Sequence, residues 1–311
     1  MVRKKIKIKY LLLYVLLMVF FFVAIPLAVT SIFSIPPQQN PKSTYKGNIP
    51  DTIKVYITKE EKYKTVDFES YIAGVVASEM PATFDIEALK AQAVASRTYA
   101  LGKINANSHL CDTVHCQVYR SKNIPKKVKK AVTATSGQVL LYKGKLATQT
   151  LYFSSSAGDT ENAEEVFSNP YPYLVGVSSD NEPGATHKKE VVKLSIKSFG
   201  KKIRKAIPEL EFGTIKKSNI KILSYTDGGR VKTIKVGKQT LTGADIRKAL
   251  SLYSTRFDID FDGNIIKITT RGSGHGVGMS QYGANGLAKT GKTYPEILAH
   301  YYQGTTIGQS K

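Results

Sequence analysis

The sequence predicts an α+β fold with a central, Ala-rich helix, and three observations favour this class. Segments that alternate apolar and polar residues like strands are mixed with segments of helical periodicity. These segments do not follow the regular strand-helix-strand order of a parallel sheet, and no internal repeat, Rossmann or P-loop fingerprint is present. An N-terminal apolar stretch is long enough to cross a bilayer. We therefore expect one membrane-spanning helix followed by a mixed helix and strand domain.

The first 33 residues predict a membrane anchor. Residues 1–9, MVRKKIKIK, hold five cations and no acid, and residues 10–33 carry no charge. Because about 20 apolar residues span a bilayer and basic residues stay on the cytoplasmic side, we expect a single-pass helix with a cytoplasmic N-terminus. Ala24 and Ala28 leave signal-peptide cleavage as the alternative, since small residues there resemble a processing site. In both cases the rest of the chain lies outside the cytoplasm.

The remaining chain divides into a Pro-rich, polar linker, residues 34–51, and one large domain, residues 52–311. The chain holds 45 Lys and Arg against 24 acids; without the first nine residues, 40 cations against 24 acids leave +16. Such a surface attracts polyanions, although charge also serves solubility. Because the domain is expected outside the cytoplasm, nucleic acid is excluded as a natural partner, and wall polymers or the anionic membrane surface are favoured.

The domain is expected to begin with a strand and two helices. TIKVYIT (52–58) alternates like a strand. Asp67 is placed to cap a helix through residue 78, and Asp85 to cap a longer helix from Ile86 to about Ile104. The longer helix is rich in Ala, which has the highest helix propensity and permits close packing. We expect it to be the buried centre of the domain.

The rest of the domain is expected to mix helices and strands. In chain order the pattern predicts a loop over 105–123, a basic helix over 124–135, strands over 137–142 and 145–156, and a strand followed by a basic helix over 191–210. Further strands follow, with hairpin turns at TDGG (226–229) and FDGN (261–264). A short capped helix, TGADIRKAL (242–250), lies between these turns.

Glu79 is the candidate catalytic acid. It follows the first expected helix, and the dipole at a helix C-terminus disfavours negative charge. Its sequence neighbours are small or apolar, so desolvation would raise the pKa of its side chain. Both effects keep a proton on Glu79 near neutral pH, as a general acid requires. The simpler interpretation is a capping or solvated acid, which already explains Asp85 and Glu87.

Two cations on the Ala-rich helix are candidate substrate-binding residues. Lys90 and Arg97 are seven residues apart and so share a face of the helix. They are expected either to form a basic wall beside Glu79 that holds an anionic substrate, or to lie along a solvated edge.

Residues 153–167, FSSSAGDTENAEEVF, are dense in hydroxyl and small side chains. Ser and Thr are common turn formers, and no G-x-S-x-G motif supports a Ser nucleophile. Together with Asn162 and the aromatic pair Tyr171 and Tyr173, this composition would also suit a sugar-binding groove.

The segment RGSGHGVGMSQYGANGLA (271–288) has Gly at every other position around His275. Such Gly residues mark a bend or a close approach of the backbone. A substrate contact, a buried structural His and a plain tight turn are all open interpretations for His275.

The two cysteines of the chain lie in HLCDTVHC (109–116). Thiols outside the cytoplasm are usually paired, but a disulfide here would close only a small loop. Two His and two Cys also supply a set of four tetrahedral zinc ligands, although adjacent ligands are cramped and the spacing is not that of a standard finger: His109, Cys111, His115 and Cys116. Zinc, a disulfide and free thiols all stay open on spacing alone.

Four stretches together resemble the stage II sporulation protein D family. They are YIAGVVASEMPATFDIEALKAQAVASRTYAL, DTVHCQVY, LYFSSSAGDTENAEEVF with PYLVGV, and GSGHGVGMSQYGANGLA. The match runs in order over about residues 52–307. It implies a membrane-anchored lytic transglycosylase of forespore engulfment, whose catalytic domain lies between the mother-cell and forespore membranes. Such enzymes cut between N-acetylmuramic acid and N-acetylglucosamine in peptidoglycan strands already stripped of stem peptides.

The resemblance also implies roles for individual residues. Glu79, in S-E-M-P, matches the catalytic glutamate of the family, and the Gly-His-Gly segment matches His275. The groove-lining and other substrate contacts are expected from Ser155, Ser156, Asn162, Tyr173 and Gln281, besides Lys90 and Arg97. Some clostridial relatives bind zinc through the Cys/His loop; His109 is the weakest match because their first His lies further from the first Cys. The implied partners are an amidase that removes stem peptides and a multi-span sporulation membrane protein.

The implied reaction explains why one carboxyl would suffice. Glycosidases that use water or a covalent intermediate need two carboxylates. When the C6 hydroxyl of the sugar attacks instead, giving a 1,6-anhydro product, proximity assists the attack, and Glu79 can protonate the leaving oxygen and then accept the C6 proton. Lys90 and Arg97 would orient the groove or bind the lactyl carboxylate of muramic acid. Zinc would be a structural staple, and catalysis would need no cofactor.

The competing hypothesis is a glycan-binding amidase enhancer, because the family also includes such proteins. Under that hypothesis the domain binds glycan and stimulates another enzyme without cutting. Glu79 would then be a structural or sugar-contacting acid.

Overall fold

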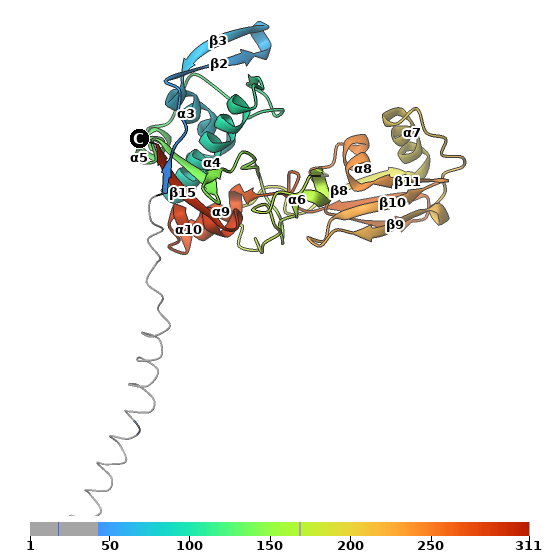
Figure 1. The fold of residues 1–311 in the computed structure, drawn as a ribbon. Coiled ribbons are helices and arrows are strands. Elements are labelled where there is room, and N and C mark those ends of the chain that lie inside the picture. Colours follow the sequence, from blue (N-terminus) through green and yellow to red (C-terminus); the bar gives the residue numbers. More distant parts are fainter. Residues whose placement is uncertain (1–17, 19–42, 168, 311) are drawn as a thin grey trace, which may run out of the picture. The chain divides into compact units, whose positions relative to one another are not determined.

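The computed structural model describes residues 18, 43–167 and 169–310 (Figure 1). The expected anchor, residues 10–33, lies outside the described residues apart from Met18. None of the helices in the described part of the chain is both long and apolar enough to cross a membrane. Residues 43–310 form one compact unit, and both hydrophobic cores lie within it. A unit with its own cores is expected to fold by itself.

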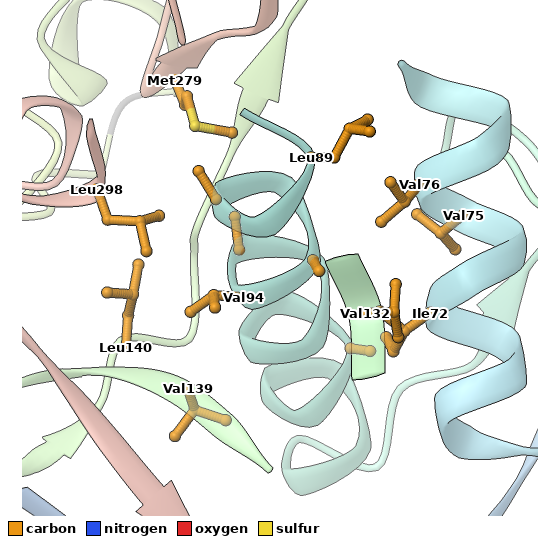
Figure 2. Close-up of a cluster of buried hydrophobic side chains, with 14 of the residues drawn as sticks. Ile72, Val75, Val76, Leu89, Val94, Val132, Val139, Leu140, Met279 and Leu298 are labelled. Atoms are coloured by element: carbon orange, nitrogen blue, oxygen red, sulfur yellow. The ribbon is translucent and has the colours of Figure 1, made fainter. Parts of the chain in front are cut away.

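The first hydrophobic core is built around α4 (Ile86–Asn105). This helix packs against four other helices, α3 (Phe68–Glu79), α5 (Lys126–Ala134), α9 (Gln281–Lys289) and α10 (Tyr294–Tyr301). Its residues from Ala91 to Gly102 are all buried, because small Ala side chains let neighbours approach on every side. Figure 2 shows the apolar side chains that meet around it, among them Ile72, Val76, Leu89, Val94, Val132, Leu140 and Leu298. The expected central helix is therefore present.

The caps of the two long helices explain where they begin. The Asp67 side chain accepts a hydrogen bond from the Ser70 N–H at 2.7 Å, and Asp85 accepts one from the Glu87 N–H at 2.9 Å. Each cap satisfies a backbone donor that the first turn of a helix leaves unpaired. Both predicted caps are confirmed.

Short strands surround this core. One sheet has the order β1-β15-β5-β6, a second has β3-β2-β4, and β7 pairs with β14. Their bounds are β1 (Ser43–Tyr45), β2 (Thr52–Ile57), β3 (Lys62–Asp67), β4 (Leu110–Cys111), β5 (Gln138–Tyr142), β6 (Lys145–Leu146), β7 (Tyr152–Phe153), β14 (Met279–Ser280) and β15 (Thr305–Ser310). Because β1 pairs with the last strand, β15, part of the expected linker already belongs to the fold.

A second hydrophobic core lies within residues 190–270. We call these residues the inserted lobe, because the chain belongs to the first core before them and returns to it at β14. Two antiparallel sheets, β11-β10-β9 and β12-β13-β8, carry α7 and α8 (Figure 1). The bounds are β8 (Glu190–Ser195), α7 (Ile196–Ala206), β9 (Ile220–Tyr225), β10 (Val231–Val236), β11 (Gln239–Thr242), α8 (Gly243–Leu250), β12 (Phe257–Asp262) and β13 (Ile265–Thr270). The two expected hairpin turns and the capped helix are confirmed.

One expected strand is broken. The sequence pattern predicts a strand over 145–156, whereas the structure has only β6 and β7 there. Between them, Thr150 Oγ1 donates to the Ala95 carbonyl at 2.8 Å, and the Gln149 N–H donates to the Tyr173 hydroxyl at 3.0 Å. These polar groups bond to α4 and to a tyrosine instead of to a neighbouring strand, so the apolar alternation alone was misleading.

A buried ion pair joins α3 to α4. Arg97 is fully buried, and its Nε and Nη2 donate to the two carboxylate oxygens of Glu69 at 2.8 and 2.7 Å. A third bond runs from Nη1 to the Gln138 carbonyl of β5 at 3.1 Å. Because a bidentate arginine–carboxylate pair is geometrically specific, Arg97 fixes how α3, α4 and β5 pack together.

We expect Glu69→Gln to destabilise residues 42–311 by about 1–3 kcal/mol, because it leaves the buried Arg97 guanidinium without its charged partner. This range is below that for fully buried pairs because the Glu69 side chain is 32% exposed. The measurement is the urea unfolding midpoint. Glu60→Gln, which loses an exposed ion pair with Lys62, is the control and should leave the midpoint unchanged. Equal midpoints for the two variants would contradict a structural role for Arg97.

Candidate functional site

A cavity of about 540 Å³ contains Glu79 in its wall, a volume typical of small-ligand sites. Its lining comes from α3, α4, the loop after β4, β7, residues 167–171, the inserted lobe and residues 274–275, and includes Glu79, Tyr99, Gln117, Tyr152, Tyr171 and His275. Of the described residues that line the cavity, Glu79 alone carries a carboxyl group. Any acid–base chemistry that needs a carboxyl therefore falls to this residue.

The surroundings of Glu79 favour its protonated form. The Val118 N–H donates to Oε1 at 2.8 Å, and Gln281 Nε2 lies 3.5 Å from Oε2. Burial raises the pKa of Glu79, and these two hydrogen bonds offset only part of that rise. No cation among the described residues forms an ion pair with it. The sequence-based expectation of a raised pKa is confirmed, with desolvation as the leading cause.

The order Glu-Met-Pro explains why the carboxyl is held at the end of α3. Met80 precedes Pro81 and adopts an extended conformation (φ −121°, ψ 140°), as residues before proline do. Its N–H still bonds to the Val76 carbonyl at 3.0 Å, which closes the last turn. The helix thus ends at Glu79, and the buried Met80 side chain packs in the first core.

His275 belongs to the cavity wall and is neutral. Its Nδ1 accepts a hydrogen bond from the Val277 N–H at 3.1 Å, and its ring contacts those of Phe153 and Phe167. Burial, and then the positive charges of Arg230 and Arg247, lower its pKa to about 4. With Nδ1 as acceptor, the single ring proton resides on Nε2. His275 therefore cannot attract an anion by charge.

Glycine is required beside this histidine. Gly276 has φ +91°, and a Cβ there would lie 2.5 Å from Nε of Arg230. Gly274 has φ +113°, and a Cβ there would lie 2.6 Å from that of Phe153. The alternating glycines thus let the backbone pass close to buried side chains, as the sequence pattern predicted.

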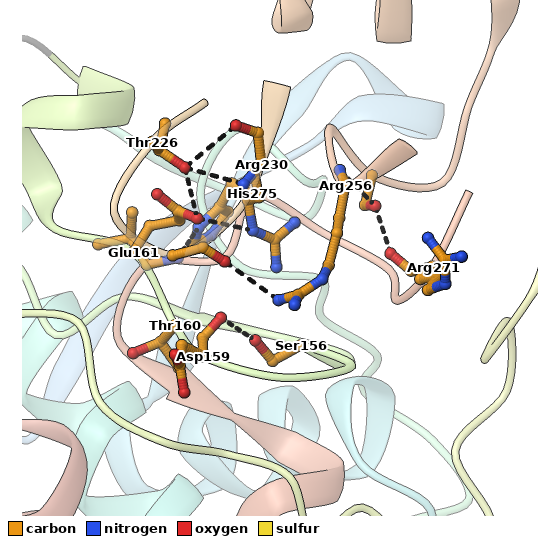
Figure 3. A network of polar contacts seen from close by, with 12 residues as sticks. Ser156, Asp159, Thr160, Glu161, Thr226, Arg230, Arg256, Arg271 and His275 are labelled. Carbon is orange, nitrogen blue, oxygen red and sulfur yellow. Dashed lines mark hydrogen bonds and ion pairs between the residues drawn. The ribbon is translucent and has the colours of Figure 1, made fainter. Parts of the chain in front are cut away.

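A buried ionic network joins the inserted lobe to the segment that carries His275 (Figure 3). Glu161 Oε1 accepts from Thr226 Oγ1 at 3.0 Å and lies 3.3 Å from Nε of Arg230. The Glu161 N–H donates to the Gly276 carbonyl at 2.8 Å. Burial lowers the pKa of Arg230 to about 10, and the negative charge of Glu161 opposes that shift. Because either charge would be costly to bury without the other, the two side chains stabilise each other. This network fixes the lobe at the cavity.

The buried carboxyl of Glu182 positions α9. It accepts hydrogen bonds from the backbone N–H groups of Ser156 and Ala157 at 2.7 and 2.9 Å, and from the Ser280 hydroxyl. Ser280 is the N-cap of α9, and the next residue is Gln281, which contacts Glu79. Glu182 thus holds in place the helix that supplies a partner to the candidate acid.

Lys90 and Arg97 do not lie where the sequence analysis expected them. Arg97 is paired with Glu69, and Lys90 Nζ lies 2.6 Å from the Glu87 carboxylate and over the Tyr294 ring. Neither is among the described residues that line the cavity. Lys90 and Arg97 therefore do not form the expected basic wall beside Glu79. The reason is that each cation is paired with an acid within hydrogen-bond reach.

Four expected substrate contacts are likewise engaged inside the fold. Ser155 and Ser156 are buried, and their hydroxyls donate to the carbonyls of Thr186 and Asp159. The Asn162 amide oxygen accepts from the Gly176 N–H at 2.8 Å, and the buried Tyr173 hydroxyl accepts from Gln149. None of the four belongs to the described lining. These hydroxyls therefore shape the loop, as turn-forming residues do.

Other residues provide the polar and aromatic lining instead. Gln117 Nε2 donates to the Tyr152 hydroxyl at 3.0 Å, and burial raises the pKa of Tyr152 well above its usual value, with Glu79 contributing. Tyr171 lines the cavity in place of its neighbour Tyr173. The DTVHCQVY, LYFSSS and PYPYL segments contain these residues, but only the folded chain shows which side chains face inward.

The Cys/His loop does not assemble the expected zinc site. The sulfurs of Cys111 and Cys116 are free thiols 2.8 Å apart. The His109 ring packs on Tyr63, while His115 lies in the cavity lining. Within the described part of the chain, no group of three or more His, Cys, Asp or Glu side chains is arranged to hold a metal. As placed, the four residues do not fit a tetrahedral zinc site.

Comparison with known proteins identifies the family. The family model described as stage II sporulation protein matches residues 56–142. Stage II sporulation protein D of Bacillus subtilis (strain 168) is 38% identical over 298 residues, covering 89% of this chain and 84% of that protein. Its namesake from Bacillus amyloliquefaciens is 37% identical over 281 residues, covering 84% and 80%. The amidase enhancer of Bacillus subtilis is 32% identical over 284 residues, covering 76% of this chain and 40% of that protein.

These relatives span most of the chain at identities that establish common descent, and the matched region contains Glu79 and the helices that position it. The chain therefore belongs to the stage II sporulation protein D family.

Proposed function

We propose that this protein is a lytic transglycosylase that cuts peptide-stripped peptidoglycan strands between N-acetylmuramic acid and N-acetylglucosamine. The observation that carries the proposal is the part-buried carboxyl of Glu79 in a cavity whose described lining holds no second acid. Hydrolysing glycosidases need two carboxyl groups, whereas attack by an internal hydroxyl needs one. A raised pKa equips Glu79 to begin the reaction as a proton donor.

The proposed reaction consumes no water. Protonated Glu79 gives its proton to the glycosidic oxygen, and the bond from that oxygen to C1 of the muramic acid residue breaks. The C6 hydroxyl oxygen of the same residue bonds to C1, and its proton passes to the Glu79 carboxylate. The products are a 1,6-anhydromuramic end and a free N-acetylglucosamine C4 hydroxyl, with Glu79 again protonated. Between the two transfers, the Val118 N–H and Gln281 stabilise the carboxylate.

The proposed setting is that of the sporulation family. We infer a single-pass anchor at residues 10–33 and a catalytic domain between the mother-cell and forespore membranes, from the apolar N-terminus and its basic arm. The proposed partners are an amidase that removes stem peptides and a multi-span sporulation membrane protein. The sporulation names of two relatives support this setting.

A glycan-binding amidase enhancer is the second candidate. The relative of that name, 32% identical to this chain, favours it. In that case the cavity would bind glycan, and Glu79 would contact sugar without transferring a proton. The product assay below separates the two candidates.

We expect residues 42–311 to convert peptide-free glycan strands into fragments that end in 1,6-anhydromuramic acid, identified by mass spectrometry. Glu79→Gln, which cannot donate the proton, should lower the rate about 10²- to 10⁴-fold. Glu209→Gln, an exposed acid outside the cavity lining, is the control and should match the wild type. Reducing ends that contain added water would indicate a hydrolase. Tight binding without cleavage would support the enhancer.

The pH profile tests the protonation state of Glu79. Because the donor form is protonated, kcat/KM should fall as the pH rises through the Glu79 pKa. Gln281→Ala removes a hydrogen bond that lowers this pKa, so the alkaline limb of the profile should move to higher pH. Gln303→Ala, an exposed site, should leave the limb in place. An unchanged or downward-shifted limb for Gln281→Ala would argue against Glu79 as the acid.

A further inference from the structure

Arg247 is the cation that the inserted lobe contributes to the cavity of Glu79. It lies on α8, and of the described lining residues it alone is a Lys or Arg. The other charged or titratable side chains of the lining are those of the part-buried acid Glu79, two His, three Tyr and one Cys. Arg247 is therefore the one permanent positive charge in the described wall.

Arg247 has no acidic partner among the described residues. Its Nε donates to the Leu252 carbonyl at 3.3 Å, and no carboxylate of the described chain forms an ion pair with it. Burial alone lowers its pKa, and no neighbouring acid opposes the shift. Arg97 and Arg230, the fully buried arginines, are paired with Glu69 and Glu161. A desolvated cation without an anion is unfavourable unless a ligand provides one.

The local field around Arg247 is positive. Its charge lowers the pKa values of both Arg230 and His275, and Arg256 adds to the effect on Arg230. Glu79 does not compensate, because its raised pKa favours the neutral form. A negatively charged group that enters the cavity therefore gains free energy from Arg247 that a neutral group does not.

We propose that Arg247 binds the free lactyl carboxylate of a muramic acid residue in the cavity and so selects strands without stem peptides. The inference rests on the proposed function and deepens it. A guanidinium presents two parallel N–H groups that match the two oxygens of a carboxylate. In a strand that retains its peptides, the same carboxyl is part of an amide, which is neutral and has one oxygen only. Arg247 cannot form the bidentate pair with that group.

Arg247 thus takes the carboxylate-binding role that was expected of Lys90 and Arg97. Those two cations are neutralised by Glu87 and Glu69 outside the cavity lining. The residue that selects the glycan strand and the residue that cuts it then belong to different parts of the fold. The acid is placed by α3, and the cation by α8 of the inserted lobe.

The test compares two tetrasaccharides of alternating N-acetylglucosamine and N-acetylmuramic acid. One has free lactyl carboxylates, and the other has them converted to N-methylamides, which mimic the first peptide bond. Binding is measured by calorimetry at neutral pH with the full chain in detergent, in a Glu79→Gln background that cannot transfer the proton. The variants are Arg247→Gln, Arg247→Lys and, as the control on the same helix, the exposed Lys248→Gln.

The parent protein should bind the acid tetrasaccharide roughly tenfold or more tightly than the amide, the range of a charged hydrogen-bonded pair. Arg247→Gln should abolish this preference while leaving the affinity for the amide unchanged, which also shows that the cavity is intact. Arg247→Lys should retain part of it, and Lys248→Gln all of it.

A preference that survives Arg247→Gln, or a parent protein that binds both ligands equally, would overturn the proposal. If Arg247→Gln fails to fold, a full preference in Arg247→Lys would overturn it as well, because lysine cannot form the bidentate pair. These outcomes are independent of the product assay with wild-type protein. Formation of 1,6-anhydro ends without a preference for the acid would leave the proposed function standing and the role of Arg247 refuted.

Discussion

Glu79 is part-buried at the end of α3, and no cation of the described residues forms an ion pair with it; the chemistry of the site depends on that arrangement. Burial favours the neutral carboxyl, and the hydrogen bonds from Val118 and Gln281 moderate the effect. A nearby Lys or Arg would reverse it by stabilising the carboxylate. Arg97, on the neighbouring helix, is paired with Glu69 in the first turn of α3, whereas Glu79 is the last residue of that helix.

Two hydrophobic cores share the construction of the cavity. The first core, around α4, fixes the acid and the aromatic wall, and the inserted lobe adds Arg247. A lobe that contributes to a site must be held there, and the buried Glu161–Arg230 pair does this beside His275. Such a pair is a weak source of net stability but a strong constraint on geometry, since either charge left alone would be costly.

Residues outside the cavity lining also hold the site in position. Glu182 holds the start of α9, and α9 presents Gln281 to Glu79. The glycines around His275 let the backbone approach Arg230 and Phe153 closely enough for the lobe and the first core to meet. The serine-rich loop at residues 154–157 is part of the same support, because its backbone N–H groups bind Glu182. Its hydroxyls are therefore structural features of the loop.

Local sequence patterns predicted the caps at Asp67 and Asp85, the Ala-rich helix and the hairpin turns. Each depends on neighbours along the chain, through helix capping, turn chemistry and periodicity. The folding of distant segments, by contrast, supplies the burial that raises the pKa of Glu79, pairs Arg97 with an acid 28 positions away and places Arg247 in the cavity wall. How distant segments pack decides which charges pair over long range and whether a side chain faces the cavity or the solvent. A local sequence pattern does not contain that information.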